Sequence, residues 1–213
     1  MTNILVTGSK GQLGSELQAL SKEYEYNFFF TDRSTLDITN KADIEAFVNL
    51  HDIHLIINAA AYTAVDKAES DEQMANKINH LALEYLATIA KEKNIKLIHV
   101  STDYVFDGKN YKPYNEDDIT NPNGVYGQTK LDGEKALQSI NPQNSIIIRT
   151  AWVYSSFGAN FVKTMLRLGK EKVSLGVIFD QVGTPTYARD LAKVILDIIP
   201  KIKNESVEIY HYT

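Results

Sequence analysis

Short apolar runs alternate with amphipathic stretches along most of this 213-residue chain. The apolar runs are rich in β-branched residues and end at turn residues, which is typical of buried strands. The stretches between them carry apolar side chains at helical spacing, as Ile78, Tyr85 and Ile89 do. Strands that alternate with helices predict an α/β fold built on a doubly wound parallel sheet.

The pattern predicts six strands and five helices. The first strand lies just before Gly8, and the others lie at 26–31, 54–58, 95–100, 146–149 and 207–212. The helices are predicted at 12–23, 41–51, 71–93, 126–137 and 188–199, and a long polar loop spans 107–123. We expect a Rossmann-like dinucleotide-binding domain at 1–150, and the start of a substrate-binding part at 151–213.

Composition narrows the class of protein. The chain is 44% hydrophobic, which is enough for a full core, and its net charge of −5 without a basic run argues against nucleic acid or anionic membrane as partners. Without cysteine it has no disulfide, thiolate metal site or cysteine nucleophile, and its five histidines are scattered without metal-ligand spacing. No apolar run approaches the ~20 residues of a membrane span, and no signal peptide is evident, so a cytoplasmic protein is expected.

Three glycines directly after the first strand, Gly8, Gly11 and Gly14, form the pattern G-x-x-G-x-x-G. In a βαβ unit such glycines allow a sharp turn, a close approach of backbone to a pyrophosphate, and tight packing of helix on strand. The N-terminus of the next helix adds free N–H groups and a partial positive charge. The position predicts a dinucleotide site rather than the alternative, a plain glycine-rich turn.

Asp32 ends the second strand eighteen residues after Gly14, near the spacing at which a carboxylate binds the adenosine ribose. A carboxylate repels a ribose 2′-phosphate, whereas Lys10 and Arg33 could attract one. The sequence therefore leaves NADH and NADPH both open as cofactors. A residue that merely ends a strand is the alternative interpretation of Asp32.

Polar and small residues follow the third and fourth strands, at the sheet edge where ligands bind in open α/β folds. Ala59, Ala60 and Ala61 would let a flat ligand lie against backbone, or would serve helix packing. Ser101, Thr102 and Asp103 could polarise a carbonyl group or could simply cap the loop.

Tyr126 and Lys130 are four residues apart on a predicted helix and so share one face. An ammonium group beside a phenol lowers the phenol's pKa, which would make Tyr126 a proton donor and acceptor near neutrality. The spacing alone is weak evidence, since chance would produce about one such pair in a chain of this composition. Its position after the fourth strand favours the catalytic interpretation.

In this order, the glycine motif, Asn58-Ala-Ala, Ser101-Thr102-Asp103 and Tyr126-x-x-x-Lys130 resemble the extended short-chain dehydrogenase/reductases. Longer strings resemble the nucleotide-sugar reductases of that family, from residue 4 to about 195; they lie at 58–69, 101–108, 149–154 and 160–166, with Asp180-Gln-x-Gly-x-Pro-Thr186. The resemblance implies hydride transfer from NADH or NADPH to the C4 ketone of a dTDP-linked deoxy sugar, giving dTDP-L-rhamnose.

The resemblance also implies roles for single residues. Tyr126 would donate the proton, Lys130 would hold the nicotinamide ribose, and Thr102 would bind the sugar oxygen at the reacting carbon. Trp152 is implied to lie near the sugar, with a buried anchor after the fifth strand as the alternative. Besides Gly8, Gly14, Tyr126 and Lys130, the implied cofactor contacts are Gly11, Gln12, Leu13, Asp32, Asp37, Ile38, Ala61, Tyr62 and Thr63; the implied substrate contacts are Val65, Thr102, Asp103 and Trp152.

Two other functions remain open at this point. One is a different extended family member, such as an epimerase that retains its cofactor. The other is a binding module without catalysis, since a regulatory subunit of methionine adenosyltransferase resembles these reductases. The family continues for several dozen residues beyond the point that matches Thr213, so the substrate lobe is expected to be partial, and a homodimer is the expected assembly.

Overall fold

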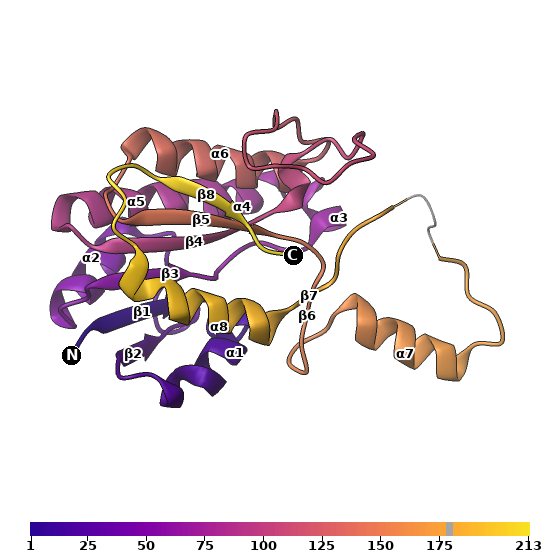
Figure 1. Cartoon of the computed structure of the whole chain (residues 1–213), viewed down its shortest axis with the longest axis horizontal. Coiled ribbons are helices and arrows are strands. Elements are labelled where there is room, and N and C mark those ends of the chain that lie inside the picture. Colours follow the sequence, from indigo (N-terminus) through magenta and orange to yellow (C-terminus); the bar gives the residue numbers. More distant parts are fainter. Residues whose placement is uncertain (178–180) are drawn as a thin grey trace.

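The computed structural model describes residues 1–177 and 181–213, so Asp180 of the predicted motif lies outside the described residues. A six-stranded parallel sheet forms its centre, in the order β2-β1-β3-β4-β5-β8 (Figure 1). This confirms the predicted doubly wound, Rossmann-like fold class. The strands are β1 (Asn3–Thr7), β2 (Asn27–Phe30), β3 (Leu55–Asn58), β4 (Lys96–Thr102), β5 (Ser145–Thr150) and β8 (Glu208–His211).

Helices cover both faces of this sheet. On one face lie α1 (Gln12–Leu20) and α8 (Ala188–Ile198), which pack against each other. The other face carries α2 (Lys41–Leu50), α5 (Ala82–Lys93) and α6 (Val125–Ile140). Successive residues of each strand enter opposite cores: Ile4 and Val6 pack with α1, and Leu5 packs with α2 and α5. Because both faces are buried, the strands are apolar throughout.

The predicted elements agree with the observed ones within a few residues, with two informative differences. β4 extends to Thr102, so Ser101 and Thr102 belong to the strand and not to the loop. The helix predicted at 71–93 is divided into α4 (Glu72–Asn76), a π-helical turn at Lys77–Leu81, and α5. Asn79 in that turn accepts a hydrogen bond from the Tyr62 N–H (2.8 Å), which anchors the loop after β3. The short helix α3 (Val65–Ala68) ends this loop.

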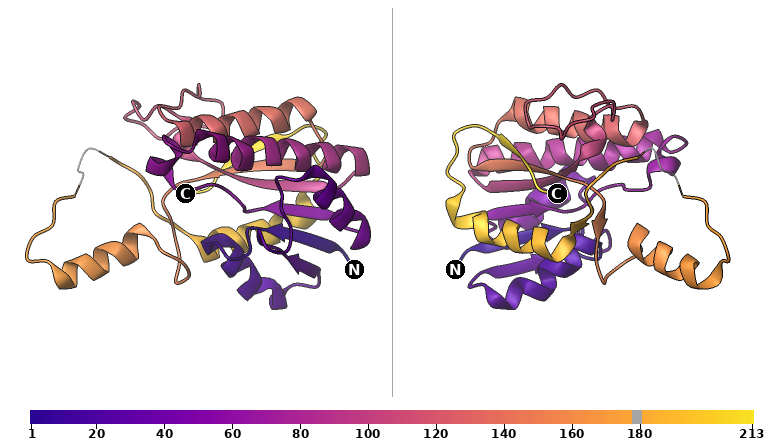
Figure 2. Two further views of the ribbon diagram at one scale, coloured as in Figure 1. Left: turned by 180° about the vertical axis from the view of Figure 1, so that it is seen from behind. Right: turned by 45° about the vertical axis from the view of Figure 1, so that its right-hand side comes forward.

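Residues 161–177 extend away from the body of the protein. A short parallel pair, β6 (Val153–Tyr154) with β7 (Thr186–Tyr187), marks the base of this extension. The helix α7 (Phe161–Glu171) projects to one side of the sheet and buries none of its residues (Figures 1 and 2). Farther along, α8 and β8 return to the sheet, although both lie beyond the boundary predicted at residue 150. The division into two domains stays a prediction.

Among the described helices, none combines the length and the apolar character that crossing a membrane requires.

Candidate active site

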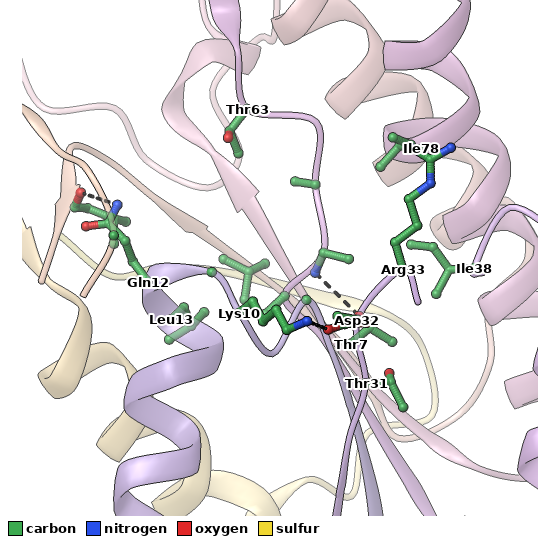
Figure 3. Close-up of a pocket in the computed structure, with 18 of the residues that line it drawn as sticks. Thr7, Lys10, Gln12, Leu13, Thr31, Asp32, Arg33, Ile38, Thr63 and Ile78 are labelled. Atoms are coloured by element: carbon green, nitrogen blue, oxygen red, sulfur yellow. Dashed lines mark hydrogen bonds and ion pairs between the residues drawn. The ribbon is translucent and has the colours of Figure 1, made fainter. Parts of the chain in front are cut away.

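The candidate site lies where the loops after β1 and β3 diverge, at the carboxyl ends of the strands. The strand order changes direction between these neighbours, and open α/β sheets bind ligands in the crevice at such a point. A cavity of 570 Å³ opens there (Figure 3). Its wall combines the glycine loop, the end of β2, the residues after β3, the end of β4, and the first turns of α6.

Backbone packing explains two of the three glycines. Gly8 has a φ of +68°, and a Cβ there would lie 2.7 Å from the carbonyl oxygen of Ala59. A Cβ on Gly14 would lie 2.3 Å from the carbonyl oxygen of Gly8, so helix α1 could not sit so close to the turn. Both positions therefore require glycine, and together they hold the loop at the edge of the cavity.

Gly11 differs because its surroundings are more open. It is the N-cap of α1, with extended backbone and no capping side chain, so N–H groups of the first turn remain available to a ligand. A Cβ there would meet the Gly8 carbonyl oxygen at 3.2 Å, which is tight but not excluded. This arrangement fits a pyrophosphate group lying against the loop.

Gly11→Val should therefore lower the affinity for NADPH at least ~100-fold, because the isopropyl group would occupy the space of the pyrophosphate, a loss of about 3 kcal/mol. The fold should remain, since the backbone at Gly11 suits any residue. Fluorescence titration with NADPH, beside circular dichroism and thermal melting, measures both effects. Wild-type affinity in this variant would show that the loop does not bind the phosphates.

Asp32 lies on the cavity wall, but its carboxylate already has partners. Lys10 forms an ion pair with it, and Ser34 donates to Oδ1 from both its N–H (2.7 Å) and its hydroxyl group. The bond from Lys10, followed by those from Ser34, lowers the pKa of Asp32 well below its usual range. In Figure 3 Lys10 points toward Asp32, whereas Arg33 extends along the wall near Ile38 and Ile78.

Lys77 lines the cavity as well, as Lys10 and Arg33 do. Asp37 belongs to the same wall and accepts from the N–H (2.9 Å) and the hydroxyl (2.7 Å) of Thr39, which lowers its pKa. Positive and negative groups thus stand side by side where the adenosine ribose was predicted to bind.

Tyr126, in the first turn of α6, is another residue of the cavity wall. Its ring meets that of Tyr104 edge-on, with centroids 5.5 Å apart. Burial raises the pKa of Tyr126 to about 12, and the Thr102 side chain offsets this only in part. The prediction that Lys130 lowers this pKa is therefore wrong.

The reason is the direction of the lysine side chain. Lys130 is 1% exposed, and its Nζ donates to the Val100 carbonyl oxygen (2.8 Å) and contacts His99 Nε2 (3.1 Å). Burial lowers the pKa of Lys130 itself to about 8, with Glu134 acting in the opposite direction. The i, i+4 spacing places both side chains on one face of the helix. The Lys130 amino group, however, is held by contacts with β4.

Thr102, at the end of β4, donates from its hydroxyl to Asp103 Oδ1 (3.0 Å) and accepts from the Tyr104 N–H (3.2 Å). Burial raises the pKa of Asp103. The Thr102 hydroxyl and the protonated Tyr126 phenol thus lie together. The phenol can donate to an oxygen placed between them, and Thr102 can do so once its proton turns from Asp103 to that oxygen. This pair is the feature that can stabilise negative charge on a reacting carbonyl oxygen.

Not every predicted residue reaches the cavity. Tyr62 turns away, donating its hydroxyl to Asp71 Oδ2 (3.1 Å). Trp152 is half-buried against Phe161, with ring centroids 5.3 Å apart, so it is not a fully buried anchor. The predicted residues on the wall are Gly8, Gly11, Gln12, Leu13, Asp32, Asp37, Ile38, Ala61, Thr63, Tyr126 and Lys130; Gly14, Tyr62, Val65, Thr102, Asp103 and Trp152 do not form part of it.

Sequence reasoning named Ser101 as a group that could polarise a carbonyl, but it missed Thr150. Ser101 Oγ and Thr150 Oγ1 are buried without a hydrogen-bond partner among the described residues, and both residues line the cavity. Such orphaned hydroxyls fit a polar ligand that satisfies them when bound. His99, which lies behind Lys130, was also missed, and Asn58 was recognised only as part of the Asn58-Ala-Ala motif, without a role of its own. Their position in the middle or at the end of apolar strands was the available signal, since buried polar side chains need partners.

Comparison with known proteins places the chain in a family. The RmlD substrate-binding domain model matches residues 1–213. A dTDP-4-dehydrorhamnose reductase of Aggregatibacter actinomycetemcomitans is 46% identical to this chain. The match covers 100% of this chain and 74% of the length of that reductase. Solved reductases of the same name share the fold: that of Clostridium acetobutylicum is 43% identical with a TM-score of 0.93, over 100% of this chain and 74% of its own.

A third relative carries a dinucleotide. The dTDP-4-dehydrorhamnose reductase of Bacillus anthracis, solved in complex with NADP, is 37% identical with a TM-score of 0.93, over 100% of this chain and 75% of its own. These findings confirm the resemblance inferred from the sequence. The chain belongs to the RmlD substrate-binding domain family.

Proposed function

We propose that this protein reduces the C4 ketone of dTDP-4-dehydro-L-rhamnose to dTDP-L-rhamnose with NADPH or NADH, a step in nucleotide-sugar and cell-surface polysaccharide biosynthesis. The observation that carries the proposal is the pair Thr102–Tyr126 beside a 570 Å³ cavity lined by the glycine loop, in a chain 46% identical to a dTDP-4-dehydrorhamnose reductase.

The residues of the cavity suit the cofactor. In this proposal Gly8, Gly11 and the first turn of α1 hold the pyrophosphate, Asp32 and Lys10 contact the adenosine ribose, and Lys130 holds the nicotinamide ribose. The orphaned hydroxyls of Ser101 and Thr150 support a polar occupant at the inner wall. When bound, the cofactor supplies the hydride.

The protein's own contribution is to hold and deliver a proton. With a pKa near 12, Tyr126 is protonated at neutral pH, which is the state that a proton donor needs. Thr102 donates a hydrogen bond to the same sugar oxygen. Negative charge forms on that oxygen only as the ketone is reduced, so these donors favour the transition state over the ground state. Val65, Asp103 and Trp152 are the proposed contacts to the nucleotide sugar.

The test is the oxidation of NADPH and NADH by the full-length protein with dTDP-4-dehydro-L-rhamnose, followed at 340 nm as an absorbance loss. Turnover with this sugar, and formation of dTDP-L-rhamnose by mass and NMR, supports the proposal. No turnover despite demonstrated NADPH binding overturns it. A tightly retained dinucleotide would then favour an epimerase, and a stable complex with methionine adenosyltransferase would favour a binding module.

We expect both cofactors to be used, with a ratio of kcat/KM well below a thousandfold, or ~4 kcal/mol. The reason is that Asp32 repels a 2′-phosphate while Lys10, Arg33 and Lys77 attract one on the same wall. Lys10→Ala should shift the ratio toward NADH, because it removes one of the cations. A strong preference for one cofactor in the wild type would show that one of these groups does not face the ribose.

The homodimer and the cytoplasmic location expected from the sequence stay predictions.

A further inference from the structure

A chain of four buried polar side chains runs behind the cavity, through four separate elements. It begins at Lys130 on α6, whose Nζ lies 3.1 Å from His99 Nε2 on β4. His99 Nδ1 lies 3.1 Å from Asn58 Nδ2 at the end of β3, and Asn58 Oδ1 accepts from the Thr7 hydroxyl (2.7 Å) at the end of β1. Each of the four residues is 1% exposed.

The hydrogen bonds of this chain depend on one another. His99 is uncharged, because burial, followed by the nearby Lys130, holds its pKa well below the usual value. With the amide nitrogen of Asn58 toward it, Nδ1 accepts, and the single ring proton must be on Nε2, facing Lys130. That arrangement suits an uncharged Lys130 amine, which accepts from Nε2 and donates to the Val100 carbonyl oxygen.

The same four residues also allow the opposite arrangement. If Lys130 is an ammonium, Nε2 must accept from it, so the ring proton is on Nδ1 and Asn58 turns its amide oxygen toward His99. The amide nitrogen of Asn58 then donates to the Thr7 hydroxyl. Lys130, His99 and Asn58 therefore have partners in both states, Thr7 changes from donor to acceptor toward Asn58, and no side chain has to leave its place.

If these positions served only to fill the core, polar side chains would not be needed there. A buried histidine facing a buried lysine costs desolvation energy that an apolar side chain of similar size would avoid. The other ionisable groups near Lys130 are Tyr126 and Glu134 on its own helix, and Glu134 is paired with Arg149 from β5. The elements β1 and β3 contribute only the neutral Thr7 and Asn58, so His99 is the ring that faces the lysine from the sheet.

We propose that His99, supported by Asn58 and Thr7, is a positioning residue that holds the Lys130 amino group at the cavity wall in both of its charge states. The functional consequence rests on the proposed role of Lys130 at the nicotinamide ribose. There, a fixed amino group keeps the ribose, and through it the reacting face of the cofactor, aligned with Tyr126.

The primary experiment measures the protonation of the Lys130 amino group directly. Lysine labelled with ¹³C at Cε is titrated by NMR in the full-length protein, and the Lys130 signal is assigned by its loss in Lys130→Met. His99→Leu, which keeps the bulk but not the hydrogen bonds, should move the Lys130 titration midpoint by at least one pH unit. Asn58→Ala, which leaves His99 in place without its support, should move the midpoint in the same direction by less.

Kinetics then separates positioning from packing. We expect His99→Leu to lower kcat at least tenfold with the KM for NADPH changed less than threefold. His99→Gln, whose amide can donate to or accept from Nζ, should recover most of that loss. Ile98→Val is the matched control, since Ile98 neighbours His99 in β4 but packs in the opposite core with α1 and α8. It should leave the Lys130 titration and kcat as in the wild type.

An unchanged Lys130 titration in both His99→Leu and Asn58→Ala would overturn the proposal. So would equal losses of kcat in His99→Leu and His99→Gln with one common pH profile. Because the titration uses no sugar, it remains informative if the wild type fails to reduce dTDP-4-dehydro-L-rhamnose, an outcome that would count against the proposed function alone.

Discussion

Tyr126→Phe should lower kcat for sugar reduction about a thousandfold, while the protein binds NADPH and melts nearly as the wild type does. General acid catalysis contributes roughly a hundredfold to ten-thousandfold, and Phe removes only the hydroxyl that would supply the proton. The ring itself keeps its edge-on contact with Tyr104. Stopped assays with excess enzyme would measure the residual rate, and fluorescence titration would measure NADPH binding.

Tyr104→Phe is the matched control for this experiment. Tyr104 touches the ring of Tyr126 and is 43% exposed, so its hydroxyl can be removed without changing the packing at Tyr126. We expect kcat within a few-fold of the wild type. If the two variants lost activity equally, the proton donor would have to be another group. If Tyr126→Phe kept wild-type turnover, the proposed mechanism would be wrong.

Glu134→Ala should lower the free energy of unfolding by about 3–5 kcal/mol, the cost of leaving a buried charge without its partner. Arg149 Nε and Nη2 donate to the Glu134 carboxylate at 3.1 and 2.7 Å, and both residues are almost completely buried. Arg149 Nη1 also donates to the Glu116 carbonyl oxygen (3.3 Å), which ties the loop after β4 to the sheet. Urea denaturation, fitted with a common slope, measures the loss.

Two further variants separate charge from volume in this ion pair. Glu134→Gln keeps the size and part of the hydrogen bonding, so it should lose somewhat less than Glu134→Ala. The double variant Glu134→Leu with Arg149→Met should regain much of the stability, because apolar pairs can replace a buried ion pair once no charge is left alone. A loss below 1 kcal/mol in Glu134→Ala would mean that water reaches Arg149 when its partner is removed.

Local features of the fold were predictable from the sequence, because each depends on neighbours within a few residues. The apolar runs specified β1, β3, β4 and β5 because burial on both faces demands near-continuous apolar side chains. Gly8 and Gly14 could be recognised because a turn between strand and helix places backbone against backbone, whatever the rest of the chain does. Asn40 caps α2 by accepting from the Ala42 N–H, a contact that likewise involves only neighbours in the sequence.

The direction and charge of the site's side chains were not predictable, since they depend on residues far apart in sequence. Helical spacing put Tyr126 and Lys130 on one face, but His99, thirty-one residues away, holds the lysine toward the sheet. The spacing between Gly14 and Asp32 suggested a contact with the ribose. It did not show that Lys10 and Ser34 already bind the Asp32 carboxylate.

The pairing of the last strand also depends on residues far apart in the sequence. The sequence by itself determined the fold class, the glycine loop and the identity of the candidate catalytic residues. Only the tertiary structure decided that β8 returns to pair with β5, that Tyr126 has a raised pKa, and that Lys130 has a lowered one. Periodicity and turn geometry are local properties of a chain, whereas burial, pairing and pKa depend on what folding brings together through space.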